Sequence, residues 1–182
     1  MDANALAAVL GEALPGVAVE AVPSVDLQST LYVQPDDVVR VLEVLRDRAE
    51  LKFEVLAEMT AADYWPREPR FEVIYLLISV QNRLRLRLKV RLPGDDPHVP
   101  TATGLWASAN WLEREIWDMF GIAFVGHPDM RRILLPDDWI GHPLRKDYVY
   151  PQDYDGVAHL RAGQRFDGGP VRAAAPPPPQ AA

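Results

Sequence analysis

The hydrophobic positions of residues 35–48 repeat with the period of an α-helix. Four apolar residues recur at i, i+3, i+4 and i+7: Val38, Val41, Leu42 and Leu45. Pro35 in the first turn, two aspartates after it and arginines near the end all suit the helix dipole. The pattern therefore predicts a helix here. An Ala/Leu-rich stretch at 3–14, closed by Pro15-Gly16, predicts a second, shorter helix.

Two neighbouring segments have the pattern of an antiparallel hairpin. Residues 71–80 are nearly apolar on both faces, as a central strand would be. Residues 83–92 alternate strictly between basic and apolar positions, and only Gln81-Asn82 separates the two segments. Shorter β-branched runs at 17–22 and 27–33 predict two further strands. The pattern of residues 53–64 is mixed and assigns no element.

The alternating segment places five basic side chains on one face of its strand. They are Arg83, Arg85, Arg87, Lys89 and Arg91. One interpretation is docking of a phosphate backbone or an acidic protein. The other, which we favour, is a solvated face whose charges discourage edge-to-edge aggregation. No aromatic residues interleave with the charges for base stacking, so nucleic acid is disfavoured and a protein partner stays open.

The second half changes character after Pro93-Gly94. Prolines interrupt nearly all of it except one helical stretch ending at Phe120, and four of the five tryptophans lie here. Asn110 and Glu113 resemble a capping box, and Gly121 is a natural helix stop. Leu112, Ile116, Met119 and Phe120 form an apolar stripe. We expect Glu113 and Glu115 on a charged helix face, and Arg114 paired with Asp118.

The triplet Gly-His-Pro occurs twice, at 126–128 and 141–143, and each copy is followed by basic residues. One interpretation makes His127 and His142 metal ligands or an acid/base pair, joined by Asp129, Asp137 or Asp138. The other, which we favour, makes them turn histidines whose ring nitrogens bind nearby backbone or carboxylate groups. A catalytic metal would need about three converging ligands, and no two histidines share a helical spacing.

Composition narrows the possible functions further. The chain has 182 residues, 48% hydrophobic and 25% charged, as expected of a globular protein with one core. It contains no cysteine, which excludes iron–sulfur clusters, thiolate nucleophiles and disulfides in this chain. The net charge of -7 disfavours nucleic acid. The N-terminus lacks the basic region of a signal peptide, and we expect no transmembrane segment.

These patterns predict an α+β fold: a mixed sheet with helices packed on it, followed by an extended Pro-rich passage that contains one helix. Residues 1–95 would form the α/β core. Residues 96–167 would add the helix and an extended partner-binding segment to the same domain. Residues 168–182, rich in Ala and Pro, would be a disordered tail.

Residues 110–148 resemble a known signature. The matching segments are Glu113-Arg114-Glu115, residues 117–122, 126–128 and 131–134, and Gly141 to Tyr148. Together they are similar to the 30-kilodalton subunit of respiratory complex I, which in bacteria is a subunit of NADH-quinone oxidoreductase. The order of predicted elements upstream is similar as well. The resemblance departs at Val149, which precedes Tyr150-Pro151, and in the tail.

The resemblance implies a non-redox scaffold subunit in the peripheral arm of a proton-translocating NADH:quinone oxidoreductase, non-catalytic by itself. FMN, Fe–S clusters and quinone would belong to other subunits, and this chain would bind no cofactor or metal. Its main partner would be the quinone-site neighbour, the 49-kDa-type subunit. The chain would lie at the cytoplasmic side of the inner membrane, as a peripheral protein.

Twelve residues are the expected partner interface. They are Glu113, Arg114, Glu115, Trp117, Phe120, His127, Arg131, Arg132, Trp139, His142, Arg145 and Lys146. Two alternatives stay open. One is the equivalent subunit of a membrane hydrogenase or a coenzyme F420 dehydrogenase, and the other is a small metalloenzyme that uses the two histidines.

Overall fold

The computed structural model describes residues 1–151 and 153–158, so the expected tail at 168–182 lies outside the described residues. The described part of the chain forms three α-helices, one turn of 3-10 helix and nine strands. In chain order these are α1 (Ala3–Ala13), β1 (Val19–Val22), β2 (Thr30–Val33), η1 (Pro35–Asp37), α2 (Val38–Asp47), β3 (Val55–Asp63), β4 (Phe71–Ser79), β5 (Leu84–Leu92), β6 (His98–Pro100), α3 (Ala109–Phe120), β7 (Ala123–Val125), β8 (Asp153–Tyr154) and β9 (Val157–Ala158).

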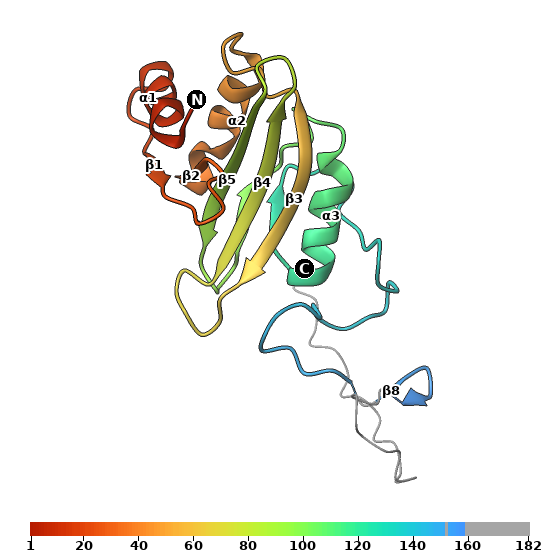
Figure 1. Ribbon diagram of the computed structural model, residues 1–182. Helices are drawn as coiled ribbons and strands as arrows, with labels where there is room; N and C mark the ends of the chain where they lie inside the picture. The colour runs from red at the N-terminus through yellow and green to blue at the C-terminus, as the bar shows by residue number, and fades with distance from the viewer. Residues whose placement is uncertain (152, 159–182) are drawn as a thin grey trace.

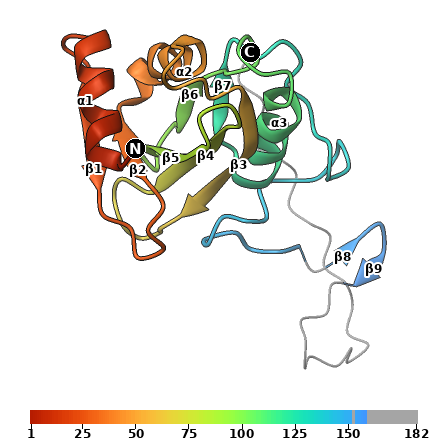
Figure 2. The ribbon, with the colours of Figure 1, turned by 45° about the horizontal axis from the view of Figure 1, so that its top comes forward.

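The main sheet has five strands in the order β1-β2-β5-β4-β3. Strands β2 and β5 pair in parallel, and the other neighbours pair antiparallel. Figures 1 and 2 together show the three helices on one side of this sheet. The expected α+β fold with a mixed sheet is therefore confirmed.

The expected hairpin is present as β4 and β5, but its surroundings differ from the prediction. Four residues, 80–83, join the strands, and Arg83 closes the turn with a φ of 54°. Strand β5 is the middle strand of the sheet and pairs on both sides. The interpretation that its basic residues protect a sheet edge is therefore wrong, because β5 has no free edge.

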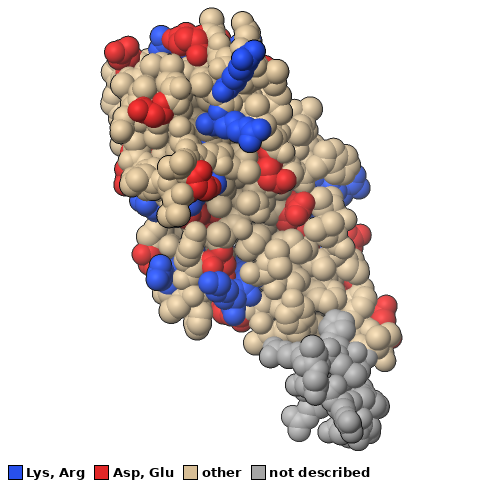
Figure 3. All heavy atoms as spheres, in the orientation of Figure 1, with Lys and Arg blue, Asp and Glu red and all other residues tan. Residues whose placement is uncertain are grey.

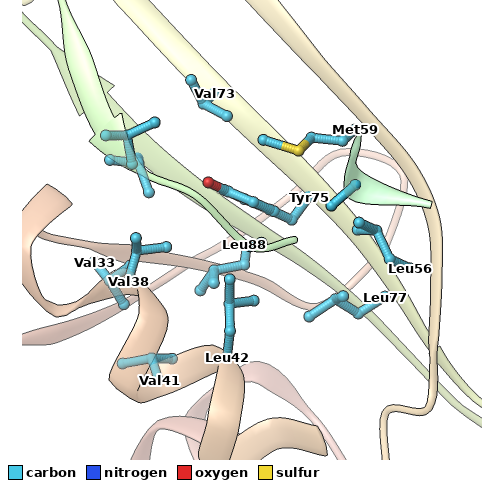
Figure 4. Packing of buried hydrophobic residues seen from close by; sticks show 14 of the residues in the cluster. Val33, Val38, Val41, Leu42, Leu56, Met59, Val73, Tyr75, Leu77 and Leu88 are labelled. Atoms are coloured by element: carbon cyan, nitrogen blue, oxygen red, sulfur yellow. The ribbon is translucent and has the colours of Figure 1, made fainter. Parts of the chain in front are cut away.

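The hydrophobic core lies between the sheet and the helices. Alternate residues of β4 and β5 point into it, among them Val73, Tyr75 and Leu88, and Figure 4 shows them facing Val41 and Leu42 of α2. Helix α3 packs against β3 on the same side of the sheet. The core therefore fixes α3 beside the sheet, with its end leading into the Pro-rich part of the chain.

Candidate functional site

Helix α3 carries a charged residue into the core. The carboxylate of Glu113 is fully buried and accepts hydrogen bonds from the Thr101 hydroxyl at 2.5 Å and the Ala102 N–H at 2.6 Å. Burial raises the pKa of Glu113 to about 7, although both hydrogen bonds favour the charged form. The expected capping box is wrong, because Glu113 holds the chain before the helix instead of the helix start.

The expected charged helix face is also only partly correct. Glu115 is exposed, whereas Arg114 is buried and donates to the backbone oxygens of Arg131 and Arg132 at 3.0 and 3.3 Å. Arg114 therefore does not pair with Asp118. Segments distant in sequence supply the partners that local spacing assigned within the helix.

Asp118 organises the chain that follows the helix. Its side chain is inaccessible to solvent, and its Oδ2 accepts the N–H groups of three consecutive residues at 2.9 to 3.1 Å: Ile133, Leu134 and Leu135. Its Oδ1 accepts from the Arg132 guanidinium at 2.5 Å. Burial opposes ionisation of Asp118, but these donors outweigh it and lower its pKa. One buried carboxylate thus holds a stretch of irregular backbone.

Arg132 extends this connection. Its Nη2 donates to the backbone oxygens of Trp139 at 2.8 Å and Gly141 at 3.1 Å. The guanidinium also lies 5.6 Å from the ring centre of Trp117. Asp118 and Arg132 together tie residues 131–141 to the last turns of α3. A buried ion pair of this kind specifies one conformation, because both charges lose water and need each other.

The C-terminal end of α3 is capped by the same passage. His142 Nδ1 donates to the backbone oxygen of Asp118, the Leu144 N–H donates to that of Met119, and Arg145 Nε donates to that of Phe120. The last carbonyl groups of a helix have no partner within the helix, and a cation there complements the helix dipole. Burial lowers the pKa of His142.

Gly121 is required at this junction. Its φ is 70°, and a Cβ there would collide with the His142 ring and come within 2.7 Å of Arg145 Nη2. We expect Gly121→Ala to lower the free energy of unfolding by more than about 1 kcal/mol. Gly11 lies within α1 with open space around it, so Gly11→Ala should instead stabilise the chain by up to about 1 kcal/mol. Thermal unfolding of both variants tests these opposite signs, and equal shifts would contradict the requirement.

A second polar cluster joins the passage to the sheet. Arg70 forms two-pronged ion pairs with Asp63 and with Asp147, at 2.6 to 3.0 Å. Asp63 also accepts the Lys146 N–H at 2.8 Å. Burial opposes ionisation of Asp63, but Arg70 and the backbone donors lower its pKa to about 2. Residues 146 and 147 are therefore fixed to β3 and to the start of β4.

The two Gly-His-Pro histidines lie in turns and bind backbone groups. His127 Nε2 donates to the Asn110 oxygen at 3.2 Å, and its Nδ1 accepts the Asp129 N–H at 3.0 Å. His142 binds the end of α3. These contacts match the structural interpretation of both residues. Within residues 1–151 and 153–158, no three His, Asp or Glu side chains gather as a metal site would require.

The twelve expected interface residues differ in how far they reach solvent. Glu115, Arg131 and Lys146 are exposed, whereas Glu113, Arg114 and Phe120 are buried. The remaining six, namely Trp117, His127, Arg132, Trp139, His142 and Arg145, are half-buried. Many of their polar groups are satisfied within the chain, and their part in a partner interface stays a prediction.

Large apolar side chains that the sequence analysis did not select are more exposed. Between the anchored residues of the passage lie Leu134, 59% exposed, Ile140, 48%, Leu144, 51%, Val149, 81%, and Tyr150, 47%. On the surface of a lone globular domain such residues are usually scattered, not gathered in one short segment. We call these five residues the apolar row. Each stands within a few residues of a backbone group that Asp118, Arg132, Arg145 or Arg70 fixes.

Comparison with known proteins places this arrangement in a family. Residues 31–154 match the family described as respiratory-chain NADH dehydrogenase, 30 Kd subunit. The chain belongs to this family. The match includes the sheet from β2 onward, α3 and the passage as far as β8, so the anchored passage is part of the family's shared sequence.

Relatives within the 30 Kd subunit family are named as one and the same subunit of NADH-quinone oxidoreductase. The relative from Roseiflexus sp. (strain RS-1) is 55% identical over 118 residues, which is 65% of this chain and 68% of that protein. The relative from Citrifermentans bemidjiense is 49% identical over 119 residues, covering 65% of this chain and 73% of the relative. The chain is therefore a subunit of an NADH-quinone oxidoreductase complex.

Two solved structures are similar to this member of the family. A trypsin-resistant fragment of Nqo5 is 33% identical with a TM-score of 0.52, over 67% of this chain and 96% of that one. A chain of the membrane-bound sulfane sulfur reductase, an archaeal respiratory membrane complex, has a TM-score of 0.67 at 23% identity. It covers 94% of this chain and 98% of its own and shows a shared fold. No helix in the described part of the chain is long and apolar enough to span a membrane.

Proposed function

We propose that this chain is a non-redox scaffold subunit in the peripheral arm of a proton-translocating NADH:quinone oxidoreductase. The observation that carries the proposal is the combination of internal anchors and the apolar row. Buried ion pairs hold residues 131–147 in one conformation, and this rigid passage presents apolar side chains to solvent. A preorganised apolar surface loses little conformational entropy on binding, which suits a permanent interface.

The partner that best fits the apolar row is the quinone-site neighbour, the 49-kDa-type subunit. FMN, Fe–S clusters and quinone would be bound by other subunits, and electrons from NADH would pass through those centres. In this proposal the chain is not itself catalytic and stays peripheral on the cytoplasmic side of the inner membrane. The sequence offers no cysteine as a cluster ligand, which agrees with such a role.

The interface is tested by replacing exposed apolar residues of the passage. We expect the double variant Ile140→Ser and Leu144→Ser to reduce co-isolation of partner subunits about tenfold or more, since apolar anchors dominate most interfaces. The Leu144 N–H that caps α3 is a backbone group, so the isolated variant should keep its melting temperature. This choice is sharper than Arg145→Ala, which would also remove hydrogen bonds within the chain.

The measurement is affinity isolation of the tagged chain from gently solubilised membranes, with identification of its companions and assay of NADH-to-quinone electron transfer. Val25→Ser is the matched control, because Val25 is fully exposed in the loop between β1 and β2. Normal recovery of partners by the double variant would contradict the proposed interface. Companions typical of a hydrogenase or an F420 dehydrogenase would keep the scaffold role and change the electron donor.

A further inference from the structure

The main sheet has a second face that no helix of the described chain covers. This face is turned toward the viewer in Figure 1, with the helices behind it, and Figure 3 shows it in the same orientation. Basic and acidic side chains are interspersed there over largely uncharged surface. By the strand register, the side chains that point to this face include Glu72 and Ile74 of β4 and Arg85, Arg87 and Lys89 of β5.

One end of this open face is satisfied within the chain. Glu72 accepts hydrogen bonds from Lys89 Nζ at 2.9 Å and from the Tyr32 hydroxyl at 2.8 Å. The Arg91 guanidinium lies 3.7 Å from the ring centre of Tyr32, and Arg87 pairs with Asp26. Three of the five basic residues on β5 and its turn are therefore neutralised by partners in this chain.

The other end of the face, next to the turn between β4 and β5, is apolar. Ile74, Leu76 and Ile78 are successive outward residues of β4, and all three are half-buried although no helix lies over them. Val55 of β3 stands opposite Ile78 and is 37% exposed. The solvent face of an antiparallel sheet normally carries polar residues at alternate positions. A row of four apolar side chains is typical of a face that another layer covers.

Two unpaired cations stand beside these apolar residues. Arg85 lies directly opposite Ile78 on β5, and Arg83 ends the turn. Both side chains are exposed, and no carboxylate within the described ranges forms an ion pair with either one. Arg87, Lys89 and Arg91 on the same strand all have such partners. The charge missing at this end of the face is negative.

We infer that Val55, Ile74, Leu76, Ile78, Arg83 and Arg85, together the outer patch, bind an amphipathic helix of another subunit, with an apolar stripe flanked by Asp or Glu. Strand addition is excluded here, because β4 and β5 both pair on either side. A helix laid on the sheet would complete a three-layer packing, with helices on both faces. Its carboxylates would pair with Arg83 and Arg85 as the helix covers the apolar residues.

The outer patch is separate from the apolar row. Figure 1 shows the turn between β4 and β5 at the end of the sheet remote from the passage, which is drawn in blue. The inference goes beyond the proposed function, because it adds a second partner surface to the subunit. It also explains why Arg83 and Arg85 stay without carboxylates in a chain whose net charge is -7.

Site-specific photo-cross-linking in intact cells tests the outer patch. A benzophenone amino acid replaces Leu76, the cells are irradiated, the tagged chain is then isolated, and the cross-linked peptides are identified by mass spectrometry. The same probe at Glu43, on the exposed side of α2, is the matched control. We expect position 76 to cross-link to an acidic amphipathic helix of another subunit, and Arg85→Glu to reduce the yield about fivefold or more.

Each other result would overturn the inference. These results are cross-links from position 76 to lipid, to a second copy of this chain or to a segment without acidic residues, an absence of cross-links, and a yield unchanged by Arg85→Glu. Irradiation precedes isolation, so the test does not require the complex to survive purification. Failure of the tagged chain to recover NADH-quinone oxidoreductase subunits would count against the proposed function alone.

Discussion

The variant Asp118→Ala should unfold at a much lower temperature than the wild-type chain. The substitution leaves the Arg132 guanidinium, only 11% exposed, without a carboxylate, and it removes the acceptor of three backbone N–H groups. Breaking a buried ion pair from one side costs about 3 to 5 kcal/mol, because the remaining charge is desolvated and unpaired. For a chain of this size the melting temperature should fall by about 10 °C.

Thermal unfolding monitored by circular dichroism measures this effect. The control is Asp129→Ala, since Asp129 pairs with Arg131 where both side chains are at least half exposed, and such pairs contribute less than about 1 kcal/mol. Limited proteolysis should also cut Asp118→Ala between residues 131 and 141 first, because the released backbone becomes accessible. If both variants melted together, Asp118 would not organise the passage.

The stability of the chain should fall as the pH rises from about 5 to 8. The pKa of Glu113 is about 7 in the folded state and near 4.5 when the group is free in solution. The folded chain therefore holds this proton more tightly, so the stabilising contribution is complete below pH 4.5 and is lost as the pH rises through 7. The difference corresponds to about 3 kcal/mol between the two limits.

Glu113→Gln should remove this pH dependence and make the chain more stable at pH 8. A glutamine amide can still accept from the Ala102 N–H and can donate to the Thr101 hydroxyl. Glu115→Gln is the matched control, since it makes the same change two residues away on the exposed face of α3. Urea unfolding at pH 5 and pH 8 gives the free energies. Equal slopes with pH for the wild type and Glu113→Gln would contradict the assignment.

Local patterns predicted the elements whose partners lie on one face of one segment. Helix α2 and the hairpin of β4 and β5 follow directly from apolar spacings of 3.6 and 2 residues. Strand β3 did not follow, because its register shifts between Leu56 and Glu58, where a bulge breaks the alternation. Its inward residues Leu56 and Met59 are therefore three positions apart, which no regular strand would show.

The polar groups of α3 were harder to place for another reason. Spacings of three and four residues suggest partners within the helix, whereas Glu113 binds Thr101 and Asp118 binds residues 132–135. Only tertiary structure reveals these partners, since they come from irregular segments without periodicity. The resemblance at residues 110–148 identified the family although the local contacts predicted there were wrong.

The strand order also constrains how the chain forms during synthesis. Strand β2 lies beside β5, and its Thr30 faces Arg87, which the ribosome adds 57 residues later (87 − 30). Until β5 leaves the exit tunnel, the nascent α1, β1, β2 and α2 have an unpaired strand edge and an uncovered apolar helix face. Exposed edges of this kind favour association between chains. The interval before β5 emerges should therefore be the stage of translation at which this subunit depends most on chaperones.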